Sequence, residues 1–454
     1  MRHRCDPARD AVGVTLPSKL KLRIRKGLDL QIPGAPVQTI ENAAAARAVA
    51  LLGHDFPQQR LSLEVSEGDR VRIGQVLFRD RGDERIRFVS PASGTVAAIR
   101  RGDARRLLAV EIACAGTESV EFPRIGLDAL RTWTHEQTAQ YLLESGDWIS
   151  LRTRPFGSLA DPDARPGAIF VRAMDSNPLA ADAAVVLDGR EQDLTFGLTA
   201  LARMTDGPLY LCCRPGTAVP QDDVDRLTVV ELTGPHPAGL VGTHVHQIFP
   251  VSRTRRVWYV GYQDVLAIGR LLRTGRPDPS RVIALAGPAV RRPRLLRTVI
   301  GAASDGLVNG EIAGEPCRII SGSLLSGRIA AGPAAFLGRY HEQVCAISDR
   351  ARPSGHAPRR ISRQHSSERW STELHGQRSA FLPLDGLDDV FPLRLPLSPL
   401  LRALSAGDSH GAETMGALEI EEEDLALASY LCPAKLEHGR LLRAALDQLQ
   451  QAPR

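Results

Sequence analysis

The sequence contains no long hydrophobic run, although 43% of its 454 residues are hydrophobic. A helix that spans a bilayer needs about 20 consecutive apolar residues, and the nearest approaches, 173–187 and 329–337, are short or carry aspartate. The first ten residues are charged and lack the apolar segment of a secretory signal. We therefore expect a soluble, cytoplasmic chain that contacts a membrane only through partner proteins.

Cysteine is scarce and poorly spaced for metal or redox chemistry. An odd count of seven without a secretion signal argues against a disulfide framework. No C-x-x-C motif occurs, and the adjacent pair Cys212 and Cys213 suits neither zinc nor an iron–sulfur cluster. The glycine-rich loops that hold dinucleotides or phosphates are also missing. We expect no catalytic residue, no metal and no cofactor bound by this chain alone.

Aromatic residues make up only 5% of the chain, whereas glycine (40) and proline (31) are frequent. This balance favours many turns and short strands, and the length favours two to four domains. The net charge is +5, with arginine runs at 291–297 and 352–363. Such runs can bind nucleic acid, but dispersed basic residues are more typical of solvated faces and a basic loop. We expect no nucleic-acid partner.

Short β-rich segments alternate with turns between residues 61 and 112. The strings V-S-E-G-D-R-V-R-I-G-Q-V-L-F and S-P-A-S-G-T-V are typical of a barrel-sandwich (lipoyl-like) domain. A carrier domain needs a lysine at the hairpin tip, and 79–87 contains none. We therefore predict a structural or docking barrel at 19–124, after a flexible extension at 1–18. Its first strand begins at Lys19, where apolar and polar residues alternate.

Helical and strand-like segments alternate from 125 to 254, which predicts a doubly wound, Rossmann-like α/β domain. Residues 182–187 fit either a strand or the end of a helix. His244 and His246 would share one face of a strand and could ligate a metal. No second pair of ligands lies nearby, so a structural role is the simpler interpretation. The other predicted elements are a helix at 134–145, a helix at 194–204, and strands at 168–171, 208–213 and 227–232.

The rest of the chain divides into a β-grasp domain at 255–346, a basic loop at 347–374 and a helical domain at 375–454. The β-grasp prediction rests on a strand at 256–261, a helix at 263–274 and many glycine-rich turns. The string S-G-S-L-L-S-G at 321–327 fits a ligand-binding loop or ordinary turn glycines. The chain is thus expected to be a multidomain α/β and α+β protein.

Nine strings, in order from Lys19 onward, resemble one family: the A subunit of the bacterial sodium-pumping NADH:quinone oxidoreductase. They include K-G-L-D-L-Q-I-P-G-A-P (26–36), A-M-D-S-N-P-L-A-A-D (173–182), G-T-H-V-H (242–246) and L-E-I-E-E-E-D-L-A-L-A-S-Y-L-C-P-A-K (418–435). Two features depart from the family pattern. Cys432-Pro433-Ala434-Lys435 replaces C-P-G-K, and the basic run 348–373 replaces a longer, more apolar stretch.

The resemblance implies a peripheral component on the cytoplasmic face of the inner membrane, docked on the membrane-embedded B subunit. It implies no cofactor on this chain, with FMN, FAD and iron–sulfur centres on partner subunits and ubiquinone as substrate of the complex. The alternative is a stand-alone flavin or NADH dehydrogenase module like the flavoprotein subunit of complex I. A quinone needs hydrogen-bond donors and apolar walls. The candidate quinone-facing or docking residues are Lys26, Gly27, Gln31, Pro33, Gly34, His54 and Tyr141.

Overall fold

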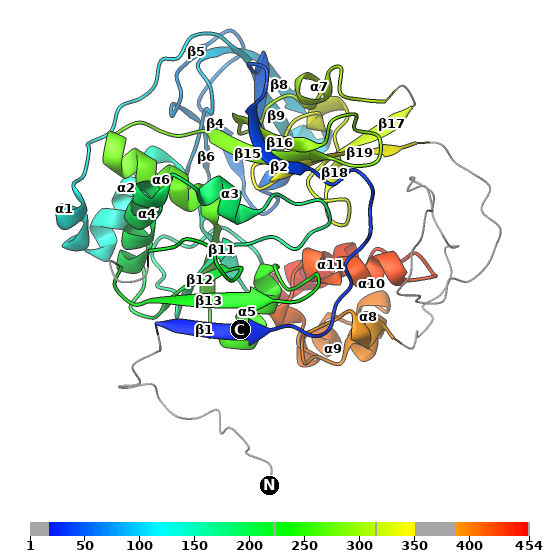
Figure 1. Cartoon of the computed structure of the whole chain (residues 1–454). Helices are drawn as coiled ribbons and strands as arrows, with labels where there is room; N and C mark the ends of the chain where they lie inside the picture. The colour runs from blue at the N-terminus through cyan, green and yellow to red at the C-terminus, as the bar shows by residue number, and fades with distance from the viewer. Residues whose placement is uncertain (1–17, 221–223, 314–315, 350–385, 453–454) are drawn as a thin grey trace.

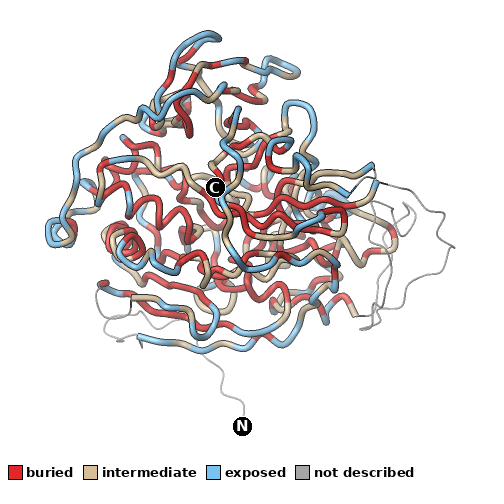
Figure 2. The backbone as a smooth tube through the Cα atoms, turned by 45° about the horizontal axis from the view of Figure 1, so that its top comes forward, coloured by how far each residue is buried: buried red, intermediate tan, exposed pale blue. Residues whose placement is uncertain are grey.

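The computed structural model describes residues 18–220, 224–313, 316–349 and 386–452. They form a β barrel, an α/β layer, a second six-stranded sheet and a cluster of C-terminal helices (Figure 1). Buried segments run through the middle of the molecule, and exposed ones follow its outer turns (Figure 2). One hydrophobic core continues from the barrel into the α/β layer.

The barrel consists of two small antiparallel sheets, with strand orders β3-β9-β8-β5 and β4-β6-β7. Phe56, Phe78 and Phe88 pack between them. The ring centroid of Phe88 lies 4.6 Å from that of Phe56 and 4.7 Å from that of Phe78. This arrangement is the predicted barrel sandwich. Its elements are β3 (Ala48–Leu52), η1 (Gly53–Asp55), β4 (Leu61–Leu63), β5 (Arg70–Val71), β6 (Val76–Asp80), β7 (Arg87–Val89), β8 (Gly94–Arg101), η2 (Asp103–Arg105) and β9 (Leu107–Cys114).

The α/β layer is a six-stranded sheet of order β1-β13-β12-β11-β14-β10. All neighbouring pairs are parallel except the edge pair of β10 and β14. Its strands are β1 (Lys19–Arg23), β10 (Arg152–Arg154), β11 (Ile169–Ala173), β12 (Leu209–Cys213), β13 (Leu227–Thr233) and β14 (Val257–Gly261). Its helices are α1 (Leu127–Arg131), α2 (His135–Ser145), η3 (Asp147–Ser150), α3 (Ala183–Leu187), α4 (Glu191–Arg203), α5 (Val241–Ile248) and α6 (Tyr262–Thr274).

Helices cover both faces of this sheet because alternate strand residues point to opposite sides. Ile169 and Val171 of β11 belong to the core under α4 and α6, whereas Phe170 belongs to the core under α5. The two helices α4 and α6 lie in backbone contact. A Cβ atom at Gly269 would stand 1.8 Å from the Asp193 carbonyl oxygen. Glycine at this position therefore permits the close packing of the two helices.

The second sheet has the strand order β18-β17-β19-β15-β16-β2. Its strands are β2 (Val37–Asn42), β15 (Ser280–Ala286), β16 (Arg294–Val299), β17 (Cys317–Ser321), β18 (Arg328–Ile329) and β19 (Gln343–Ser348). The helix α7 (Ser304–Val308) and the turn η4 (Gly332–Ala334) accompany it.

The N-terminal segment joins the two large sheets. β1 lies at the edge of the α/β sheet beside β13, and β2 lies at the edge of the second sheet beside β16. Residues 24–36, which we call the strap, run between them along the outside of the molecule, in blue in Figure 1. Sheet membership thus crosses the predicted domain boundaries. β1 and β2 fall within the range predicted for the barrel (19–124) but belong to the two large sheets. β14 and α6 extend the α/β layer beyond its predicted end at residue 254.

The C-terminal helices have a hydrophobic core of their own, which also takes in Phe156 from the turn after β10. Residues 350–374 of the predicted basic loop lie outside the described part of the chain. Among described residues, no helix combines the length and apolarity needed to cross a membrane. The C-terminal elements are η5 (Leu387–Asp389), α8 (Leu397–Ser405), α9 (Ser409–Thr414), η6 (Ala417–Glu419), η7 (Glu422–Leu425), α10 (Ala426–Leu431) and α11 (His438–Gln451).

Candidate functional site

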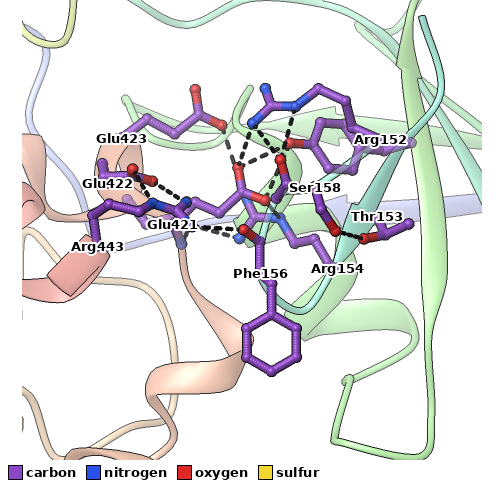
Figure 3. Close-up of polar contacts among 12 residues, drawn as sticks. Arg152, Thr153, Arg154, Phe156, Ser158, Glu421, Glu422, Glu423 and Arg443 are labelled. Carbon is purple, nitrogen blue, oxygen red and sulfur yellow. Dashed lines mark hydrogen bonds and ion pairs between the residues drawn. The ribbon is translucent and has the colours of Figure 1, made fainter. Parts of the chain in front are cut away.

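A cluster of charged residues lies where β10 and β14 meet the C-terminal helices (Figure 3). Arg154, at the end of β10, has no solvent exposure. Its Nη1 atom donates to Asp424 Oδ2 at 2.9 Å, and its Nε lies 3.4 Å from Glu421 Oε1. Because a guanidinium remains protonated in proteins, this buried charge requires the acidic run 421–424 beside it.

Glu421 contacts residues on both sides of this junction, in β14 and in η7. Its carboxylate accepts the hydroxyl of Tyr259 from β14, at 2.9 and 3.1 Å. The backbone N–H of Glu421 donates to Asp424 Oδ2 at 2.9 Å, which closes a capping box at the start of η7. The residue after Phe156 is Gly157, where an added Cβ would stand 2.8 Å from Glu421 Oε1. The acidic run therefore fits closely against the β10 turn.

A second ion pair attaches α11 to the same turn. Arg443 holds Glu422 in two parallel bonds, Nε to Oε1 at 2.6 Å and Nη2 to Oε2 at 2.8 Å. Its Nη1 also donates to the carbonyl oxygen of Phe156 at 2.7 Å. Figure 3 shows these contacts from α11 to the turn that follows β10.

The electrostatics of this cluster fit a structural junction. Burial raises the pKa of the Glu423 carboxyl to about 7, Asp424 adds to the rise, and Arg154 opposes it. Arg154 stays charged because Glu421 and Asp424 compensate its burial. Glu421 and Asp424 thus provide the closest counter-charges of the buried arginine.

The motif G-T-H-V-H lies on the helix α5, and the prediction of a strand at 244–246 was wrong. Residues two apart on a helix point to different sides. His244 is fully buried, with Nε2 2.9 Å from the Ala238 carbonyl oxygen. His246 lies 2.7 Å from Glu419 Oε2 through Nδ1. The two rings therefore cannot share a metal, and no group of three or more potential metal ligands occurs among the described residues.

The ligand position expected of a doubly wound sheet is filled by side chains of this protein. Ligands of such folds bind at the carboxyl ends of the strands, where the strand order reverses. Here that point lies between β11 and β14. Arg172 of β11 pairs with Glu342, the residue before β19, Nη2 to Oε2, at 2.9 Å, and with Asp175, Nη1 to Oδ2, at 3.3 Å. A dinucleotide would have to displace this partly buried pair.

The seven residues predicted from the sequence lie in three different parts of the structure. Lys26, Gly27, Gln31, Pro33 and Gly34 all belong to the strap. Lys26, Gln31 and Pro33 are exposed there. An added Cβ at Gly27 would stand 2.2 Å from the His236 carbonyl oxygen. An added Cβ at Gly34 would stand 2.2 Å from the Gly287 carbonyl oxygen. These two glycines, both with positive φ, hold the strap against the two sheets it joins.

His54 and Tyr141 are separate from the strap. His54 is exposed in η1 of the barrel, where burial, Arg106 and Arg328 lower its pKa. Tyr141 is buried in α2, and its hydroxyl donates to the Pro123 carbonyl oxygen at 2.8 Å. Its ring packs against Trp133, with centroids 5.5 Å apart. The hydroxyl of Tyr141, its only side-chain donor, therefore already forms a hydrogen bond within the fold.

Arg154 and the role of its acidic partners were not predicted from the sequence. The available signal was four consecutive acidic residues beside apolar positions, because such a run can be buried only against arginines. The arginine run 291–297 has a similar explanation. Arg294 pairs with Glu311 at 2.9 Å and with Glu41 at 2.7 Å, which leaves less of the run free for an anionic partner.

The fold is that of a multidomain protein of the barrel-sandwich type. It combines the barrel, the mostly parallel α/β layer, the second sheet and the C-terminal helices. Three family profiles match successive parts of it: the NqrA N-terminal barrel-sandwich hybrid domain at 22–115, the NqrA second alpha/beta domain at 133–277 and the NQRA C-terminal domain at 282–332. The second match includes β14 and α6, in agreement with the sheet.

Curated relatives match almost end to end. The A subunit of the Na(+)-translocating NADH-quinone reductase of Yersinia pseudotuberculosis serotype O:1b (strain IP 31758) is 44% identical over 95% of this chain and 99% of its own. Those of Histophilus somni (strain 2336) and Neisseria meningitidis serogroup C (strain FAM18) are 45% and 42% identical over the same shares. The chain belongs to this family, the A subunits (NqrA) of Na(+)-translocating NADH-quinone reductase.

Proposed function

We propose that this chain is the peripheral component of a sodium-translocating NADH:ubiquinone reductase. In this proposal it docks on the membrane-embedded B subunit at the cytoplasmic face and contributes to the quinone-reducing end of electron transfer. FMN, FAD and iron–sulfur centres belong to partner subunits. The observation that carries the proposal is the 44% identity to a named A subunit over 95% of this chain and 99% of the relative.

Two features of the fold support a role without a cofactor of its own. The crevice between β11 and β14 is occupied by the Arg172–Glu342 pair, which disfavours a stand-alone flavin or NADH dehydrogenase. The barrel tip at 79–87 has no lysine to carry a swinging arm. The α/β layer in this view is Rossmann-like, and the second sheet is a β-grasp module.

The strap is the part that we propose for contact with quinone or with another protein of the complex. It presents Lys26 and Gln31 at the surface, between the two large sheets. Exposed His54 on the barrel is a further candidate donor. Tyr141 is a weaker one, because quinone binding would have to break its bond to Pro123.

The test is purification of the tagged full chain from membranes of its own host. We expect the remaining subunits to co-purify and the preparation to reduce ubiquinone with NADH in a sodium-stimulated reaction. A photoreactive quinone analogue should label the strap in that complex. If Lys26→Ala and Gln31→Ala complexes assemble and are labelled as well as wild type, the strap does not contact quinone. A chain that purifies alone with bound flavin and NADH dehydrogenase activity would contradict the whole proposal.

A further inference from the structure

A cavity of about 640 Å³ opens at one end of the barrel. Its size lies within the range of small-molecule sites, about 300–1,000 Å³. Its walls come from η1 and the residues after it, from the tip between β6 and β7, and from the β8–β9 hairpin. Apolar side chains such as Phe56 and Leu107 line part of the wall. The charged residues of the lining are Arg60, Arg81, Arg101, Arg105 and Arg106.

The charged side chains that line the cavity are all basic, and no acidic side chain of the lining balances them. No carboxylate belongs to it, and among the described residues no ion pair joins any of its five guanidinium groups to an acidic side chain. Other arginines of the same barrel are paired. Arg79 contacts Glu64, and Arg100 Nε lies 2.9 Å from Glu111 Oε1. The cavity therefore gathers arginines whose charge no neighbouring carboxylate balances.

Several like charges around one concave surface repel each other and create a positive potential. The nearby imidazole of His54 is affected by this potential: burial lowers its pKa, and Arg106 of the lining lowers it further. An anion bound in the cavity would relieve this repulsion. Because the side chains are exposed, the effect should weaken with salt.

The β8–β9 hairpin keeps this arrangement despite an unfavourable backbone. Ala104 and Arg105 have φ angles of 52° and 59°. Two successive positive φ values at a hairpin turn normally call for Asn-Gly, since side chains are strained there. Residues held in such conformations cluster at ligand-binding sites. Here the strained turn places Arg105 and Arg106 on the cavity wall, beside Arg101 at the end of β8.

We propose that this cavity binds a phosphate-bearing anion. Guanidinium groups match phosphate oxygens with paired hydrogen bonds, and several of them together suit a ligand with more than one negative charge. The phosphate could belong to a lipid headgroup or to a free phosphorylated small molecule. The proposal concerns the barrel alone and does not depend on the function proposed above.

The test is calorimetric titration of the purified full chain with inorganic pyrophosphate at low ionic strength. We expect binding that Arg60→Gln weakens about tenfold or more, the effect of losing a charged hydrogen bond. Arg105→Gly should weaken it similarly while the melting temperature stays equal or rises, because glycine suits a positive φ. Arg72→Gln is the matched control: Arg72 is exposed on the same barrel but does not line the cavity.

Vesicles distinguish the two sources of phosphate. We compare flotation with vesicles of phosphatidylcholine alone and of phosphatidylcholine mixed with an equal amount of phosphatidylglycerol. Binding to the mixed vesicles that pyrophosphate competes away identifies a lipid headgroup. Pyrophosphate binding without vesicle binding identifies a free phosphorylated molecule.

Three results overturn the proposal. The first is absence of binding to both pyrophosphate and the mixed vesicles. The second is an equal loss of affinity in Arg72→Gln, which would indicate a diffuse surface charge. The third is a polyglutamate peptide that binds as tightly as pyrophosphate, which would indicate a docking site for an acidic protein segment.

Discussion

Arg154 carries a full charge at a position without solvent exposure. Replacing a partner of such a cluster leaves the opposite charges buried and uncompensated, here Glu421 and Asp424. We predict that Arg154→Met lowers the free energy of unfolding by about 3–5 kcal/mol, measured by urea denaturation. Arg440→Met is the matched control, because Arg440 pairs with Glu437 in an exposed ion pair worth about 0–1 kcal/mol. Equal losses in both variants would contradict the structural role of Arg154.

His244 predicts a pH dependence. Burial lowers its pKa from 6.5 to about 4 in the folded protein. The unfolded chain therefore binds more protons between pH 6.5 and 4, and stability falls as the pH falls through this window. One group contributes about 1.4 kcal/mol per pH unit. His244→Gln keeps a donor for the Ala238 carbonyl but does not titrate. We expect its unfolding free energy to fall less between pH 6.5 and 5 than that of wild type; an identical fall would refute this.

At the scale of elements, α2 begins with a complete capping box. The Thr134 hydroxyl accepts from the Gln137 backbone N–H at 3.3 Å, and the Gln137 side chain accepts from the Thr134 N–H at 2.9 Å. We predict that Thr134→Ala lowers the free energy of unfolding by about 1 kcal/mol. Thr134→Asp should retain most of the wild-type stability, since an aspartate side chain also caps a helix N-terminus. Chemical denaturation of the two variants checks this, and an equal loss would show that the cap contributes little.

Elements with a strong local pattern could be predicted from the sequence. The helices at 134–145 and 263–274 were placed within a residue or two, because capping residues and apolar spacing are local signals. The strand predicted at 244–246 was wrong, since three alternating residues fit a strand and a buried helix equally well. Residues 182–187, left open between strand and helix, form α3.

Sheet membership and the charged junction could not be predicted in this way. β1 was predicted as a strand from the alternation that begins at Lys19, but which sheet a strand joins depends on contacts with residues more than 200 positions away, such as Lys19 with Val229. Arg154 and Asp424 are likewise 270 positions apart. Neither composition nor periodicity encodes such pairings in a single sequence.

At the scale of the whole molecule, buried ion pairs join the α/β layer to the segment before β19 and to the C-terminal helices. Asp264 of α6 accepts from Arg339, which lies in the turn before β19, at 2.8 Å, and Arg339 also donates to Ser150 Oγ at 2.9 Å. The C-terminal helices attach through Arg154 and through α5. Because charged contacts depend strongly on geometry, a small displacement at one junction should release a whole unit.

Gly242 of α5 tests this coupling. An added Cβ there would stand 2.2 Å from both carboxylate oxygens of Asp424, the residue that holds Arg154. Alanine usually stabilises a helix relative to glycine by about 0.5–1 kcal/mol. We predict the opposite for Gly242→Ala: lower stability and faster proteolysis of the C-terminal helices, measured by urea denaturation and limited trypsin digestion. Gly306→Ala in α7, where the added atom meets nothing within 4 Å, should be neutral or stabilising. If Gly242→Ala behaves like Gly306→Ala, the C-terminal unit does not depend on this junction for its position.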